Sequence, residues 1–290
     1  ENLQAQPSPD VPEPFTVTAE DGIELRGIRW NRHPEGPLEG TVLCLHGLCS
    51  DCNSMELVGR HLSRAGLDVI APDYRGHGLS DATSAGRMSI SQFARDARTI
   101  CARLNVSETW LFTQSLGGQT GIELLRTSNP SLDIKGLFAF APPWRLRKAP
   151  LKKLPRALLS SFKHIRNMAR TAGYNASRTP SRQDYALMRD MPDFYQPVMR
   201  EEIKSVSLRR FARLFLNMKL ADYGSRGDWT PQTDVPIHLY AARHDRYINN
   251  RNLEELAEHQ DMSLTWIDCH HVSLMTNEEH AREIGNSIIA

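Results

Sequence analysis

Residues 110–118 are Trp-Leu-Phe-Thr-Gln-Ser-Leu-Gly-Gly, and residues 119–125 continue as Gln-Thr-Gly-Ile-Glu-Leu-Leu. The first part is a short apolar run that predicts a buried strand, and the last part predicts a helix. A strand, a tight turn with a serine at its tip and a helix directly after it are typical of a nucleophile elbow. Such a turn lifts the serine hydroxyl above the sheet and aims helix amides at the group it attacks. Ser115 is therefore the candidate nucleophile.

The elbow motif departs from the usual G-x-S-x-G at one position. Thr113 stands where the first glycine is expected, so a β-branched side chain must fit between the strand and the helix. A serine before two glycines is, taken alone, more often an ordinary turn. The rest of the chain must therefore decide whether Ser115 is a nucleophile.

Composition is that of an ordinary soluble globular protein, with 290 residues, 40% apolar and 24% charged. This length suits one large domain or a domain that carries an insertion. No apolar run approaches the ~20 residues that span a bilayer. Four prolines within residues 1–14 predict a flexible N-terminal tail.

The five cysteines are few and odd in number, which argues against a disulfide framework and favours a reducing compartment such as the cytoplasm. The sequence begins at Glu1 and not at methionine, so we expect any original leader to be missing from it. Cys49 and Cys52 have the C-x-x-C spacing of a redox pair or half a metal site. No second ligand pair accompanies them, and we expect neither a metal nor a cofactor.

Predicted strands and helices alternate through most of the chain. Residues 15–19 and 23–30 flank turn residues and predict an antiparallel hairpin. The alternation predicts a mostly parallel sheet with helices on both faces, which is an α/β fold. Further strands are expected at 41–45, 69–73, 110–114, 136–141, 237–242 and 264–268, with helices at 55–65, 90–104, 119–125, 252–258 and 278–289.

The alternation stops after the sixth strand, where residues 142–231 have no strand-like run and predict several helices. Residues 145–226 contain 19 Lys and Arg against 6 Asp and Glu, a net charge of +13, while the remainder carries −12. We therefore expect a tail at 1–14, a core domain formed by 15–142 and 232–290, and a basic helical cap at 143–231.

Three polar residues follow predicted strands. Ser115 ends the fifth strand, Asp245 follows the seventh and His271 follows the last. The carboxyl ends of parallel strands meet at one crevice. A serine hydroxyl needs a histidine to accept its proton and a buried carboxylate to orient that histidine. The order Ser, Asp, His suits this topology, and backbone N–H groups of Leu48 and Leu116 would form the oxyanion hole.

Alternatives stay open at two of these positions. Asp245 could be a helix cap or turn residue, since Asp is common there. His270 is a rival of His271. We expect His46 and His77 to hold loops by hydrogen bonds and not to act as bases.

These motifs together resemble an α/β-hydrolase, of the branch that includes monoacylglycerol lipases, lysophospholipases and related serine esterases. The resemblance covers the chain from about residue 15 to its end, except the insertion, which resembles the family's cap by position and helical character. Its pattern of a histidine before a Glu-rich helix start favours His271. Three segments match motifs of this family. They are 45–48 (Leu-His-Gly-Leu), which matches the oxyanion loop, 73–80 (Asp-Tyr-Arg-Gly-His-Gly-Leu-Ser), which matches the family's Asp-x-Arg-Gly-x-Gly-x-Ser turn, and 114–118, which matches the elbow.

The resemblance implies a cofactor-free serine hydrolase of carboxylic esters, with a medium acyl chain or a monoacyl lipid as substrate. A thioesterase, a carbon–carbon bond hydrolase and a non-catalytic ligand-binding protein are the alternatives. Within the insertion, one helical face could line an acyl pocket, and its arginines could bind an anionic lipid surface or be merely solvated. No nucleic-acid motif is present, so that partner is not expected, and no oligomeric state is predicted. The pocket residues would be Phe211, Leu214, Phe215 and Met218.

Overall fold

The structure is a computed structural model, and it describes most of the predicted core domain. Of the predicted cap, it describes only a few short pieces. The described residues are 11–48, 50–81, 88–127, 131–144, 155, 158–159, 212–216, 235–245 and 247–290.

The described residues form an eight-stranded sheet in the order β1-β2-β4-β3-β5-β6-β7-β8. The β1–β2 and β2–β4 pairs are antiparallel, and the other neighbours are parallel. All eight predicted strands are confirmed, and β1 begins two residues inside the range expected for the tail. In chain order, the strands are β1 (Glu13–Thr18), β2 (Glu24–Trp30), β3 (Thr41–Leu45), β4 (Asp68–Pro72), β5 (Glu108–Gln114), β6 (Asp133–Phe140), β7 (Ile237–Ala242) and β8 (Ser263–Ile267).

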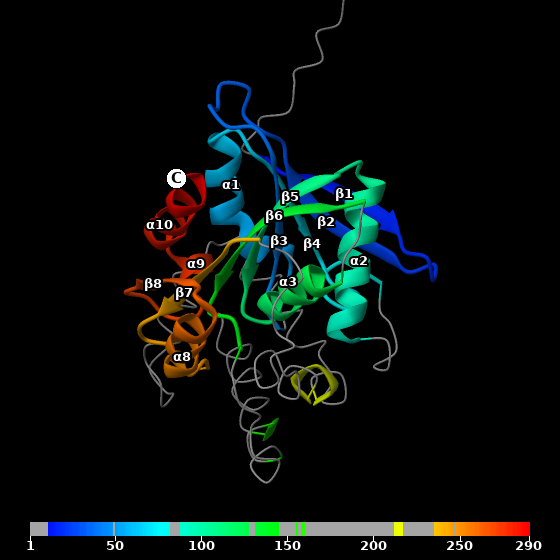
Figure 1. The fold of residues 1–290 in the computed structure, drawn as a ribbon. Helices are drawn as coiled ribbons and strands as arrows, with labels where there is room; N and C mark the ends of the chain where they lie inside the picture. The colour runs from blue at the N-terminus through cyan, green and yellow to red at the C-terminus, as the bar shows by residue number, and fades with distance from the viewer. Residues whose placement is uncertain are drawn as a thin grey trace, which may run out of the picture.

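Helices cover both faces of this sheet (Figure 1). The helices α1, α9 and α10 belong to one apolar core, and α2, α3 and α8 belong to the other. The five longer helices match the predicted ones, whereas η1 and α9 were not expected, because one turn is too short to show a helical period. The described helices are η1 (Cys52–Met55, a 3₁₀ turn), α1 (Glu56–Arg64), α2 (Ile90–Arg103), α3 (Leu116–Arg126), α8 (Asn250–Gln260), α9 (Ser273–Thr276) and α10 (Glu278–Ile289).

The two cores explain why the central strands are continuously apolar. Successive side chains of a strand point to opposite faces. In β3, Leu43 and Leu45 enter the core under α2 and α3, while Val42 and Cys44 enter the core under α1 and α10. A strand buried on both faces cannot alternate with polar residues, so the sheet is the middle layer of a three-layer α/β/α sandwich.

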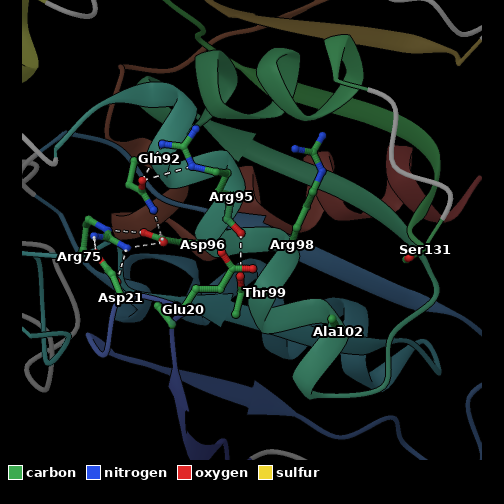
Figure 2. Close-up of a pocket in the computed structure, with 11 residues that line it drawn as sticks. Glu20, Asp21, Arg75, Gln92, Arg95, Asp96, Arg98, Thr99, Ala102 and Ser131 are labelled. Carbon is green, nitrogen blue, oxygen red and sulfur yellow. Dashed lines mark hydrogen bonds and ion pairs between the residues drawn. The ribbon is translucent and has the colours of Figure 1, made fainter.

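A buried ion-pair cluster joins three elements on the α2 side of the sheet. Arg75, in the loop after β4, has no exposed surface. Its Nε and Nη2 donate to Asp96 on α2, each at 2.6 Å, and its Nη1 donates to Asp21 in the β1–β2 turn at 2.8 Å. Figure 2 shows these contacts at one end of a cavity of about 380 Å³ that runs along α2. Arg75 thus pairs with both carboxylates and fastens the hairpin to α2.

No helix in the described ranges combines the length and the apolar character that crossing a membrane requires.

Candidate active site

Ser115 lies in the turn between β5 and α3 and has a backbone conformation that non-glycine residues rarely adopt. Its φ is 52° and its ψ is −116°. Strain of this kind costs roughly 1–3 kcal/mol and persists only where the surroundings enforce it. Here the N–H of Ser115 donates to the carbonyl of Phe140 at 2.9 Å, and its carbonyl accepts from Gly118 N–H at 2.9 Å. The turn therefore has the geometry expected of a nucleophile elbow.

Small residues around the elbow are required by close packing. A methyl group on Gly117 would lie 2.1 Å from the carbonyl oxygen of Leu45, so α3 can approach β3 only with glycine there. The unusual Thr113 is accommodated because Gly121 stands opposite it on α3. A methyl group on Gly121 would lie 3.1 Å from Cγ2 of Thr113, which shows that the threonine already occupies this space.

Asp245 and His271 are joined by a hydrogen bond of 2.7 Å between Oδ2 and Nδ1. The Asp245 side chain is fully buried, and that of His271 is 11% exposed. The other carboxylate oxygen accepts from the N–H groups of Tyr247 at 2.7 Å and Ile248 at 2.9 Å. In the neutral imidazole the proton lies on Nδ1, because that nitrogen donates to Asp245. Nε2 of His271 is then the ring atom that can accept a proton.

The neighbouring His270 has different contacts. Its ring lies 5.3 Å from that of His244, and its backbone N–H donates to Oγ of Ser273 at 2.9 Å. His244 is itself bonded to Asp268 at 2.8 Å on the surface. The structure thus brings His271, and not His270, together with Asp245.

The expected oxyanion loop, residues 45–48, is held by a neutral histidine. Nε2 of His46 accepts the N–H of Tyr74 at 3.2 Å, so the ring proton lies on Nδ1, 2.8 Å from the carbonyl oxygen of Gly47. Burial, with a smaller effect of His77, lowers the pKa of His46 to about 3. Because a trans peptide is planar, the N–H of Leu48 points away from that carbonyl and from His46. His46 therefore fixes the direction of the Leu48 amide, as expected of a loop-holding residue.

The second amide of the expected oxyanion hole belongs to Leu116, the first residue of α3. An N–H in the first turn of a helix has no carbonyl acceptor within that helix, so it can bind an anion. Leu48 and Leu116 border one apolar cluster, in which Leu116 is fully buried.

The turn after β4 is organised by a buried carboxylate. Oδ1 of Asp73 accepts from Cys52 N–H at 2.6 Å, and Oδ2 accepts from Leu79 N–H at 2.8 Å. Next to it, Asp51 is fully buried and caps η1 by accepting from Asn53 N–H at 2.8 Å. Burial, and then the charge of Asp73, raise the pKa of Asp51 to about 7. This carboxylate pair ties η1 to the turn, next to the oxyanion loop.

Only one cysteine of the C-x-x-C pair lies among the described residues. Cys49 lies outside the described residues, and burial raises the pKa of the Cys52 thiol well above its usual value. A buried neutral thiol is a poor ligand and a poor nucleophile. Among the described residues, no cluster of three or more His, Cys, Asp or Glu side chains could hold a metal ion.

Of the expected pocket residues, Phe211 and Met218 lie outside the described residues. Leu214 and Phe215 lie in a helical stretch, residues 212–216, and are buried. They belong to the same apolar cluster as Leu116.

A sequence model of the family described as "Serine aminopeptidase, S33" matches residues 36–270. A curated relative, the magnesium-chelatase 30 kDa subunit from Rhodobacter capsulatus, is 36% identical over 98 residues, or 33% of this chain. The chain spans only about a third (34%) of that relative's length.

Solved structures extend the likeness to nearly the whole chain. An esterase from Exiguobacterium antarcticum has a TM-score of 0.71 at 17% identity, and the match covers 95% of this chain and 98% of that one. An epoxide hydrolase from Vigna radiata has a TM-score of 0.68 at 19% identity, covering 97% and 98%. These likenesses concern the fold, and they confirm the predicted α/β-hydrolase fold.

Proposed function

Because this chain belongs to the serine aminopeptidase S33 family of α/β-hydrolases, we propose that it is a serine hydrolase that cleaves carboxylic esters through Ser115, His271 and Asp245. The observation that carries the proposal is the 2.7 Å bond between His271 and the fully buried Asp245. It lies at the same edge of the sheet as the strained turn of Ser115, since each residue follows the carboxyl end of a parallel strand.

The proposed reaction begins when Nε2 of His271 accepts the hydroxyl proton of Ser115 while the oxygen attacks the ester carbonyl. Asp245 stabilises the resulting imidazolium, and the amides of Leu48 and Leu116 stabilise the oxyanion. The carbon–oxygen bond to the alcohol then breaks, and the alcohol leaves with the proton from His271. Water, deprotonated by His271, attacks the acyl-enzyme, and the carboxylic acid departs as the Ser115 hydroxyl is restored.

A medium acyl chain or a monoacyl lipid is the proposed substrate. Support comes from Leu214 and Phe215, which are buried in the apolar cluster that contains Leu116. In the proposed complex the acyl chain lies against Leu214 and Phe215, and its carbonyl lies at Ser115. A thioester is the closest alternative, since the same steps would release a thiol.

The test is hydrolysis of p-nitrophenyl esters from acetate to palmitate, with wild type and Ser115→Ala compared side by side. We expect Ser115→Ala to lower kcat by roughly a thousandfold or more, because the nucleophile is lost while binding remains. Ser107→Ala removes an exposed serine just before β5 and should leave kcat unchanged.

Retained turnover in Ser115→Ala would remove that residue from the mechanism. An absence of wild-type turnover on every ester, together with no labelling of Ser115 by an organophosphonate, would refute the hydrolase proposal. Labelling without ester turnover would favour thioesters or carbon–carbon substrates.

A further inference from the structure

Gln114, the last residue of β5, contacts two loops of the proposed site. Its side chain is buried, with 2% of the residue exposed. Its Nε2 donates to the backbone carbonyl of His271 at 3.4 Å, although the two residues are 157 positions apart in sequence. Its Oε1 is buried and has no hydrogen-bond partner among the residues that the structure describes. A buried acceptor without a donor is costly, so packing, and not a hydrogen bond, holds the oxygen end of this carboxamide in place.

The oxygen end of the carboxamide lies against Gly47 in the oxyanion loop. A methyl group on Gly47 would lie 2.4 Å from Oε1, 3.2 Å from Cδ of Gln114 and 3.4 Å from Cβ of Ser115. Gly47 is not among the glycines with positive φ, so its backbone conformation is open to other residues. A side chain at position 47 would therefore force the Gln114 carboxamide or the loop to move, because Gln114 fills the space where that side chain would begin.

We propose that Gln114 is a positioning residue that fixes the separation of the oxyanion loop and the His271 loop across Ser115. One end of its carboxamide binds the carbonyl of His271, and the other end packs against Gly47. Since Gln114 directly precedes Ser115, both loops are placed relative to the elbow itself. The inference rests on the proposed function, because this separation matters only if the Leu48 amide and His271 act on the same carbonyl group.

The test is a double-mutant cycle of Gly47→Ala and Gln114→Ala. Gly47→Ala should lower kcat about 100-fold with little change in KM, because the methyl group displaces the loop by a fraction of an ångström or more. Gln114→Ala alone should lower kcat about tenfold. The double variant should be more active than Gly47→Ala, since removing the carboxamide makes room for the methyl group. Losses that simply multiply would overturn the proposal.

Two further variants separate the effect of the carboxamide's volume, the effect of its hydrogen-bond donor and general destabilisation of the fold. Gln114→Met keeps the volume and loses the donor, so it should leave Gly47→Ala impaired in the corresponding double variant. It should also change the acid limb of the pH profile of kcat/KM, which reports on His271. Gly285→Ala is the matched control, because its methyl group would lie 2.4 Å from Cδ2 of His61 between α1 and α10. It should lower Tm and leave kcat unchanged.

Thermal unfolding of the same cycle distinguishes failure of this inference from failure of the proposed function. If wild type turns over esters but the two substitutions lower kcat independently, the role of Gln114 is overturned and the proposed hydrolase function is unaffected. If wild type turns over no ester, the proposed function fails, and the Tm values of the variants then test the packing contact between Gln114 and Gly47. Independent Tm losses for Gly47→Ala and Gln114→Ala then overturn the packing contact as well, whereas coupled losses support it.

Discussion

At the scale of single residues, Asp51 links the stability of the protein to pH. Its carboxyl is fully buried beside Asp73, and its pKa is raised from 3.8 to about 7 by burial and then by that neighbour. Between these two values, the folded state holds a proton that the unfolded state has released. The free energy of unfolding therefore falls as pH rises through this window.

Asp51→Asn should remove this pH dependence. The amide can still accept the N–H of Asn53 through Oδ1 and carries no charge at any pH. The variant should therefore gain stability relative to wild type between pH 5 and pH 8, by roughly 1–3 kcal/mol, at about 1.4 kcal/mol per pKa unit. Urea unfolding at several pH values, followed by circular dichroism, measures the difference. Asp81→Asn is the contrast, because hydrogen bonds from Glu24 N–H and Arg26 lower the pKa of Asp81, and its stabilisation is lost as pH falls. A stability difference for Asp51→Asn that is the same at every pH would contradict the assignment.

The contact between Asp245 and His271 could be predicted from the sequence, because chain order and strand ends place both residues at one edge of the sheet. The role inferred for Gln114 could not. The sequence places both loops near Ser115, but it does not show that the Gln114 side chain contacts Gly47 in one loop and the His271 carbonyl in the other. The same holds for Gly121, whose missing side chain makes room for Thr113.

At the scale of elements, the central strands β3 to β7 were predictable because they form short apolar runs buried on both faces. The strands β1 and β2 are more exposed, and they were predictable from the turn residues between them. The short elements η1 and α9 were not, since each has only four residues. Contacts between elements that are far apart in sequence cannot be predicted from local sequence pattern. The ion pairs of Arg75 are the clearest example, since they join three elements (Figure 2).

Asp96→Asn should destabilise the fold by roughly 3 kcal/mol, because it leaves the buried Arg75 without its main counter-charge. Replacing both partners, as Arg75→Met with Asp96→Leu, should recover part of this loss, because no buried charge then remains unpaired. Urea unfolding measures both. The matched control is Glu39→Gln, which breaks an exposed pair with Arg32 and should change stability little. If Asp96→Asn were as mild as Glu39→Gln, the cluster would not hold the hairpin to α2.

At the scale of the whole molecule, the α/β-hydrolase fold followed from the alternation of strands and helices and from the order of motifs. The predicted cap at 143–231 is different. Helical periodicity locates helices in a sequence, but it does not say which surface each helix packs against, so the division into core and cap stays a prediction. The charge split of +13 in residues 145–226 against −12 elsewhere is the property of this segment that sequence alone defines.

We propose that this positive charge binds anionic lipid surfaces, which would bring a monoacyl substrate to the enzyme. Replacing Arg209, Arg210 and Arg213 with glutamine should weaken binding to phosphatidylserine-containing vesicles about ten- to a hundredfold at low salt, since each charge near such a surface contributes about 1 kcal/mol. The effect should shrink at high salt, where exposed charges are screened. Vesicle sedimentation at two salt concentrations provides the measurement. The matched control replaces the exposed Arg103, Arg251 and Arg282, which changes the net charge equally outside the basic segment. Equal weakening by both triple variants would mean that only net charge matters, and no weakening by either would mean that the basic segment is simply solvated.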